Sequence, residues 1–234
     1  AFVLKLDANG NQQWVRQFGT SLNDRAVGVA LDGDNIYVVG DLNVGFFDQS
    51  VPSGYIRKYD AAGTLLWNRD YSPVILFSRG ITADSTGAYV YGDNLIRKFD
   101  PNGNPLWTNT FYANALVAAA GALYATGSGP TTGLGITKLD LNGNPLWNRA
   151  YGSSNAASGL ALTADASGVT VAGDTIGAFG GQQNAGLADG FVRKLDPNGN
   201  ELWTAQFGTV GDDFSFGVAA SSGSTYVVGT TSKI

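Results

Sequence analysis

Short runs of β-branched and aromatic residues recur along the chain, and each run ends at a glycine. The runs are IYVVG at 36–40, AYVYG at 88–92, LYATG at 123–127, VTVAG at 169–173 and TYVVG at 225–229. Such runs, bounded by turn residues, are typical of β-strands. Strands of small residues precede them, as in GVALD at 28–32, GITAD at 80–84 and GVAAS at 217–221.

A second pattern, K-φ-D-x-x-G-x-x-x-W with Leu, Tyr or Phe at φ, occurs five times. Its tryptophans are Trp14, Trp67, Trp107, Trp147 and Trp203. Its aspartates are Asp7, Asp60, Asp100, Asp140 and Asp196, and its glycines are Gly10, Gly63, Gly103, Gly143 and Gly199. The tryptophans are 53, 40, 40 and 56 residues apart. This spacing is typical of the four-stranded blades of a β-propeller.

Each repeat therefore predicts four antiparallel strands. Strand A carries the small residues, strand B the YVVG run, strand C the lysine and strand D the tryptophan. Asn-Gly between C and D favours a tight hairpin. The indole is expected to dock between neighbouring blades, as the largest apolar side chain of the repeat.

The chain begins with strands C and D and ends with strands A and B. We expect these halves to pair as a fifth blade, so that no sheet edge stays open. The prediction is an all-β, five-bladed propeller with one domain over residues 1–234. The expected blades span about 28–71, 78–111, 116–151, 159–208, and 215–234 with 1–18.

The repeats resemble the bacterial β-propeller repeat family called SBBP, whose members read approximately FVAKLDPNGN-LLW, GIAVD and NVYVTG. FVRKLDPNGNELW at 191–203 is the clearest match, and the resemblance covers the whole chain. It implies a propeller in a secreted or surface protein of bacteria, generally without a known activity. The family name implies seven blades where five are visible, so a part of a larger ring stays an alternative.

The repeat core also resembles, more weakly, that of pyrroloquinoline-quinone propellers. Those enzymes usually have eight blades and hold the cofactor with polar and metal-ligating groups. No such constellation is visible in this sequence, so we expect no cofactor and no metal.

Composition narrows the function classes. The net charge is −5 and the isoelectric point about 4.5, which disfavours nucleic acid and anionic membranes as partners. Cysteine and histidine are absent, which excludes disulfides, a Ser-His-Asp triad and His-ligated zinc. The longest apolar run, 115–125, is too short to span a bilayer. Methionine is absent as well, so we expect a processed chain or a piece of a longer one.

Four polar patterns have a structural and a functional interpretation. The D-x-N-G-N segments favour capped turns over calcium loops, because the distal Glu of an EF-hand is missing. The repeated lysine favours an ion pair with the nearby aspartate, or a solvated strand face. Asp41, Asp93 and Asp174 at the ends of strand B favour turn caps over a ligand ring. The adjacent Asp212 and Asp213 lack the spacing of a glycosidase pair.

Two long B–C loops, 41–54 and 174–190, are the main candidates for a binding site. Loops of this length are commonly functional, although a plain flexible insert is an equal alternative. Exposed aromatics beside amides predict a lip that binds protein or glycan. The candidate residues are Phe46, Phe47, Asp48, Phe179, Gln182, Gln183 and Asn184.

The sequence therefore predicts a non-catalytic interaction module, with an unidentified protein or glycan as partner. We expect a monomeric module that is secreted or lies on a bacterial cell surface, and that binds through the face of the B–C and D–A loops. A lectin is the alternative, because several blades could bind sugars with avidity. A glycoside hydrolase ranks last.

Overall fold

The computed structural model describes the whole chain except residues 43–52, 72–76, 129–133, 154, 222 and 233–234. The described residues form β-strands and no helix, as the all-β prediction requires. The chain divides into two compact units, Ala1–Phe111 and Tyr112–Ile234. The prediction of a single domain over the chain stays a prediction.

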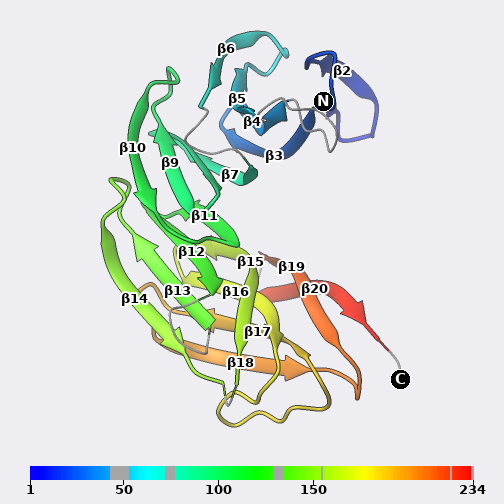
Figure 1. Cartoon of the computed structure of the whole chain (residues 1–234), viewed down its shortest axis with the longest axis vertical. Coiled ribbons are helices and arrows are strands. Elements are labelled where there is room, and N and C mark those ends of the chain that lie inside the picture. Colours follow the sequence, from blue (N-terminus) through cyan, green and yellow to red (C-terminus); the bar gives the residue numbers. More distant parts are fainter. Residues whose placement is uncertain (43–52, 72–76, 129–133, 154, 222, 233–234) are drawn as a thin grey trace. The chain divides into compact units, whose positions relative to one another are not determined.

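Unit 1 contains one two-stranded and two four-stranded sheets (Figure 1). The first consists of β1 (Phe2–Leu6) and β2 (Gln12–Gln17). The second consists of β3 (Arg25–Asp32), β4 (Asn35–Leu42), β5 (Ser53–Tyr59) and β6 (Leu65–Asp70). The third consists of β7 (Ser78–Asp84), β8 (Gly87–Gly92), β9 (Leu95–Phe99) and β10 (Pro105–Thr110).

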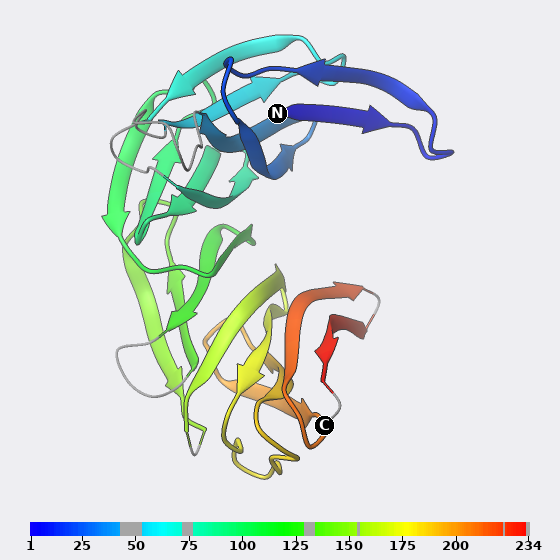
Figure 2. The ribbon, with the colours of Figure 1, turned by 45° about the vertical axis from the view of Figure 1, so that its right-hand side comes forward.

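Unit 2 repeats the pattern with two four-stranded sheets and one two-stranded sheet. Its first sheet consists of β11 (Ala115–Ala119), β12 (Ala122–Ser128), β13 (Leu134–Leu139) and β14 (Pro145–Tyr151). Its second consists of β15 (Ala157–Asp165), β16 (Gly168–Thr175), β17 (Asp189–Leu195) and β18 (Glu201–Phe207). The last consists of β19 (Asp213–Ser221) and β20 (Ser224–Thr231), and β19 lies beside β15 (Figure 2).

Every four-stranded sheet is an antiparallel meander in the predicted order A, B, C, D. The repeated residues keep one register: Tyr37 of β4 pairs with Lys58 of β5, which pairs with Trp67 of β6. Because side chains alternate along a strand, this register places the tyrosine, lysine and tryptophan of a repeat on one face. The four-stranded repeat predicted from the sequence is confirmed.

The glycine that ends each strand B is required by a close approach of two backbones. A β-carbon on Gly40 would overlap the carbonyl oxygen of Arg25 in strand A. Strand A shifts its register at this point, between Ala26 and Gly28. Such a bulge bends the strand, and it leaves no room for a side chain on the neighbouring glycine.

The turns between strands C and D are capped by the repeated aspartate. The Oδ1 atom of Asp100 accepts hydrogen bonds from the backbone N–H groups of Asn102 and Asn104, both at 2.8 Å. Its Oδ2 atom accepts a third from the Asn104 amide at 2.9 Å. Gly103 has φ +82°, which glycine adopts without strain. These hydrogen bonds are those of a capped turn, which is the structural interpretation of the D-x-N-G-N segments.

These caps predict a loss of stability in acid. Hydrogen bonds to the charged form lower the pKa of Asp7, Asp60, Asp100, Asp140 and Asp196 below the ordinary 3.8. The stabilisation is therefore present above the ordinary pKa and is lost as the pH falls through the lower folded values. Thermal melting between about pH 5 and pH 2 should show this decline. Asp100→Asn should flatten the profile, and parallel profiles for the two proteins would contradict this origin.

Three tryptophans of strand D, Trp14, Trp67 and Trp147, dock onto the C–D turn of the next sheet of the same unit. The indole Nε1 of Trp67 donates a hydrogen bond of 3.0 Å to the carbonyl of Pro101. The same bond joins Trp14 to Ala61 and Trp147 to Pro197, both at 3.1 Å. The docking between neighbouring sheets that the sequence predicts is thus present in both units.

Lys58, a lysine of the repeat, is neither solvated nor paired with its neighbouring aspartate, which corrects the sequence-based interpretation at this position. Lys58 is buried, and its Nζ donates to the carbonyl of Pro101 at 3.0 Å. It also lies 5.1 Å from the centre of the Tyr37 ring. The carbonyl and the aromatic face replace water around the ammonium group. The lysine is therefore part of the contact between sheets.

Candidate functional site: the loop end of unit 2

Three of the predicted ligand-binding residues, Phe46, Phe47 and Asp48, lie outside the described residues. The other four lie in the loop between β16 and β17, which the structure describes fully. At the same end of unit 2 lie the β14–β15 and β18–β19 connections (Figure 1). This end of unit 2 is therefore the candidate site.

Phe179 is a core residue, which corrects the expectation of an exposed aromatic. Only 1% of it is exposed. Its ring packs edge-to-face on Phe191 of β17, with centroids 4.9 Å apart. The guanidinium carbon of Arg193 lies 4.3 Å from the centroid of the Phe179 ring. Phe179 therefore anchors the long loop to the sheet, because its apolar ring gains more from burial than from exposure.

The amides of the loop fasten it to strand β18. Gln182 Oε1 accepts a hydrogen bond of 3.1 Å from the backbone N–H of Gln206. The Gln206 side chain in turn donates to Gly177 and to Asp189, and accepts from the N–H of Phe179. Asn184 closes a turn by accepting from the N–H of Gly186 at 2.8 Å. Hydrogen bonds therefore hold the loop in one conformation, and Gln183 is the exposed amide of the predicted set.

The β18–β19 loop packs on the long loop. The backbone N–H of Asp213 donates to the Ala188 carbonyl at 2.7 Å, and Asp212 Oδ1 accepts from the Ala188 N–H at 3.3 Å. Asp213 Oδ2 accepts from the N–H of Thr209. Hydrogen bonds from the Thr231 side chain and from this N–H lower the pKa of Asp213. Asp212 and Asp213 therefore have a structural role in holding the loops. The sequence analysis likewise found that they lack the spacing of a glycosidase pair.

Three apolar side chains are exposed on these loops. They are Ile176 at 50%, Leu187 at 57% and Val210 at 64%. Leu187 and Val210 lie on loops that contact each other directly. A β-carbon on Gly186, the neighbour of Leu187, would lie only 2.5 Å from the carbonyl of Val210. We call Ile176, Leu187 and Val210 the apolar loop residues. No sequence pattern signals them, because each is a single apolar residue in a polar loop.

At the end of strand B in unit 1, Asp41 has a structural role. It is fully buried, and its Oδ2 atom forms an ion pair of 2.8 Å with Arg25. Its Oδ1 atom accepts from the backbone N–H of Ser78 at 2.9 Å. Asp93 likewise accepts from the N–H of Phe77. Both carboxylates cap backbone groups, as the turn-cap interpretation expects.

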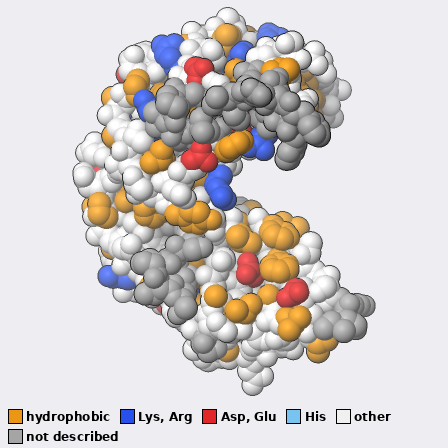
Figure 3. Space-filling model, in the orientation of Figure 1, with side chains coloured by type: hydrophobic (Ala, Val, Ile, Leu, Met, Phe, Trp, Pro, Cys, Tyr) orange, Lys and Arg blue, Asp and Glu red, His pale blue; other side chains and the backbone are white. Residues whose placement is uncertain are grey.

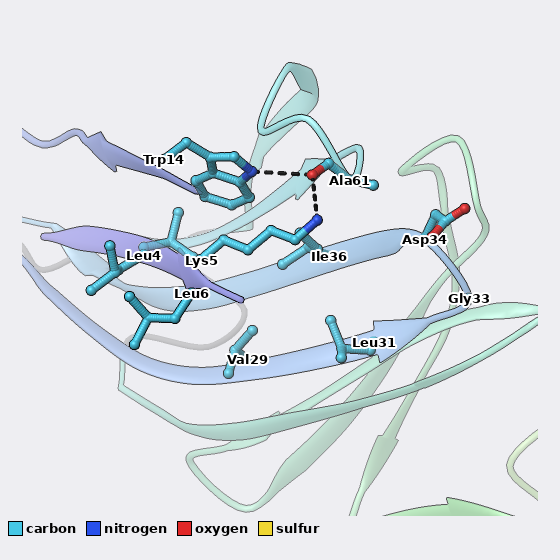
Figure 4. A pocket seen from close by; sticks show the side chains of 11 residues that line it. Leu4, Lys5, Leu6, Trp14, Val29, Leu31, Gly33, Asp34, Ile36 and Ala61 are labelled. Carbon is cyan, nitrogen blue, oxygen red and sulfur yellow. Dashed lines mark hydrogen bonds between the residues drawn. The ribbon is translucent and has the colours of Figure 1, made fainter. Parts of the chain in front are cut away.

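Unit 1 also contains a groove of about 440 Å³ beside strand β1 (Figure 4). Leu4 and Leu6 of β1 line it from one side, and Val29 and Leu31 of β3 line it from the other (Figure 4). These four side chains are exposed. Above them, Trp14 and Lys5 both donate to the carbonyl of Ala61. The groove is therefore an apolar slot next to an unpaired strand edge.

In unit 2, apolar side chains are also exposed on the strands of the last hairpin. Figure 3 shows hydrophobic side chains gathered over β15, β19 and β20. On β19 and β20 they include Phe216, Tyr226 and Val228. Equivalent tyrosines of the complete sheets, such as Tyr37, are fully buried. The hairpin therefore exposes a face whose equivalent in the complete sheets is buried, as Tyr37 is in a core cluster with Val90 and Phe99 of the neighbouring sheet.

Among the described residues, no group of three or more acidic side chains could hold a metal ion. No helix of the described chain is long and apolar enough to cross a membrane.

Asp174 is the aspartate near the end of strand B in β16. Its carboxylate is half-buried, and burial raises its pKa.

Comparison with known proteins shows the fold alone. No family model and no curated protein matches the sequence. The WD40 domain of Pan2 from Neurospora crassa superimposes with a TM-score of 0.61 and 13% identity, over 100% of this chain and 71% of that chain. A protein of unknown function from Bacteroides caccae superimposes with a TM-score of 0.54 and 13% identity, over 86% of this chain and 73% of that chain. The chain has an all-β fold like that of a propeller domain.

Proposed function

We propose that the chain forms a five-bladed propeller in which β19 and β20 complete the sheet begun by β1 and β2. The register of the complete sheets supports this arrangement. Tyr37 pairs with Lys58, Tyr89 with Lys98 and Tyr124 with Lys138. By the same register Tyr226 of β20 pairs with Lys5 of β1. The apolar groove beside β1 is then the place of the missing two strands.

We further propose that the propeller is a non-catalytic protein-interaction module, monomeric, in a secreted or cell-surface protein of bacteria. The observation that carries this proposal is the exposure of Leu187 and Val210 on two loops that contact each other and are held by hydrogen bonds. Apolar side chains that a rigid surface holds in water are typical of protein-binding patches. The resemblance to the SBBP repeats supports the location outside the cell.

The partner that fits this end of unit 2 is a protein surface with an apolar centre. Leu187 and Val210 offer aliphatic contact area, while Gln183 offers an amide at its edge. Because Gln182, Gln206 and Asp189 hold the loop by hydrogen bonds, little ordering is needed on binding. A preorganised loop loses less conformational entropy when it binds.

The double variant Leu187→Asp/Val210→Asp tests this function. Charges at the centre of an apolar contact would have to be desolvated, so binding should weaken at least about 100-fold. A partner selected against the wild-type protein by display of a peptide or protein library is titrated against both proteins by calorimetry. Circular dichroism checks that the variant keeps its fold.

Leu146→Asp is the matched control, because Leu146 is equally exposed but lies at the start of β14, next to the C–D turn. Binding should survive this change. Equal affinity of the loop variant and the control would refute the loop end as the binding site. Specific hits on a glycan array that the loop variant loses would assign the site to a lectin instead.

A further inference from the structure

Asp174 of unit 2 lacks the counter-ion that its equivalent in unit 1 has. In unit 1, Asp41 of strand B pairs in register with Arg25 of strand A, and their side chains form an ion pair of 2.8 Å. In unit 2, the register partner of Asp174 on strand A is Ser158, which carries no charge. Asp174 forms no hydrogen bond or ion pair with a described residue. Its carboxylate is therefore uncompensated within the described chain.

Partial burial makes the missing counter-ion costly. The carboxylate of Asp174 is half-buried, and burial raises its pKa because water solvates the charged form less well there. A cation placed against this carboxylate would restore the stabilisation that the solvent does not supply. Asp174 thus gains more from an external cation than a fully exposed carboxylate would.

A buried hydroxyl group beside Asp174 also lacks a partner. Ser215 of β19 is 1% exposed, and its Oγ atom forms no hydrogen bond with a described residue. This atom lies 2.7 Å from the position of a β-carbon on Gly190, the register partner of Asp174 on β17. Register partners point to the same face of a sheet, with β-carbons about 5 Å apart. The hydroxyl therefore lies at the level of Asp174 and on the same face.

The equivalent hydroxyl in unit 1 has a partner of its own chain. There, the hydroxyl of Ser78 forms a hydrogen bond with that of Tyr71, whose backbone N–H donates to Gly54 of β5. Phe207 holds the same place in unit 2, opposite Gly190 of β17, and phenylalanine has no hydroxyl. Unit 2 thus lacks both partners, the guanidinium for the carboxylate and the phenol for the hydroxyl.

The connections of the loop end contain no basic residue that could supply the cation. Residues 152–156, 176–188 and 208–212 include neither lysine nor arginine. Asp189 begins β17 at the same end, and its buried Oδ1 atom also lacks a hydrogen-bond partner among the described residues. The excess of carboxylates favours a partner with positive charge.

We propose that Asp174 and Ser215 bind the guanidinium group of an arginine that the protein partner of the loop end presents. The inference rests on the proposed function and specifies the partner, which combines an apolar centre with an arginine beside it. Arginine fits this pair of acceptors, because its planar fork of N–H donors can serve a carboxylate and a hydroxyl at once. It replaces the arginine that Ser158 does not provide.

Titration of the isotope-labelled protein with N-acetylarginine amide, followed by NMR, tests the site without a selected partner. The backbone signals of Asp174, Gly190 and Ser215 should shift and saturate, with a dissociation constant of about 1–10 mM, as two charge-assisted hydrogen bonds allow. N-acetylcitrulline amide has nearly the same shape without the charge. It is the matched control ligand and should leave these signals unchanged.

Two variants remove the site in different ways. Asp174→Asn removes the negative charge and should weaken binding of the arginine compound at least about 10-fold. Ser158→Arg supplies the guanidinium that Arg25 supplies in unit 1, so it should fill the site and weaken binding as much. Asp34→Asn, at an exposed position of the β3–β4 turn, changes the net charge equally and should bind as the wild-type protein does. Circular dichroism checks the fold of each variant.

Unchanged binding by Asp174→Asn, or equal binding of the arginine and citrulline compounds, would overturn the proposal. Calcium chloride that displaces the arginine compound better than sodium chloride of equal ionic strength would assign the carboxylate to a metal ion and overturn it as well. The compound has no apolar surface, so the Leu187→Asp/Val210→Asp variant should still bind it. Failure at Asp174 therefore leaves the proposed protein-binding function to the separate test of Leu187 and Val210.

Discussion

Replacement of Trp67 by alanine is expected to lower the free energy of unfolding by roughly 3–5 kcal/mol. The indole lies between two sheets of unit 1, 6.0 Å from the Tyr37 ring. Its loss opens a cavity there and leaves the Pro101 carbonyl with one donor fewer. Urea unfolding followed by circular dichroism measures the effect.

Two further variants separate the causes. Trp67→Phe keeps most of the apolar contact but removes the hydrogen bond. The lost hydrogen bond should cost about 1 kcal/mol, in addition to the cost of the changed packing. Leu66→Ala, at an exposed neighbour on β6, should cost less than about 0.5 kcal/mol. A loss at Trp67→Ala no larger than at Leu66→Ala would show that the docking contact does not stabilise the fold.

Replacement of Phe179 by alanine is expected to destabilise unit 2 by a similar amount, roughly 3–5 kcal/mol. Phe179 is fully packed on Phe191 and under Arg193. Truncation removes this packing and leaves the buried guanidinium of Arg193 with Tyr151 alone of its two aromatic neighbours. The long loop should detach as well, which limited proteolysis would detect as new cleavage between residues 176 and 188.

Gln183→Ala is the matched control for this experiment, because Gln183 is the exposed amide of the same loop. Its melting midpoint should equal that of the wild-type protein. If Phe179→Ala keeps wild-type stability but loses partner binding, Phe179 is a ligand contact, as the sequence analysis predicted. The structure leads us to expect the opposite result.

The candidate site was only partly predictable. Loop length singled out the connection between β16 and β17, and Gln183 is exposed there. Phe179, however, turned inward, because an aromatic residue in a loop packs on whichever apolar surface the fold offers. Leu187 and Val210 could not be found from the pattern, because nothing local distinguishes an exposed aliphatic residue from a buried one.

The sequence by itself determined the repeat: the order of four strands, the turn built on Asp100 and Gly103, and the glycine at the end of strand B. These features depend on residues close in the chain, so local geometry suffices to specify them. Only the tertiary structure decided what the repeated Lys58 and Trp67 contact, and which loop residues face the solvent. Those contacts join residues from different sheets, and their partners are set by how the sheets pack, which no local pattern encodes.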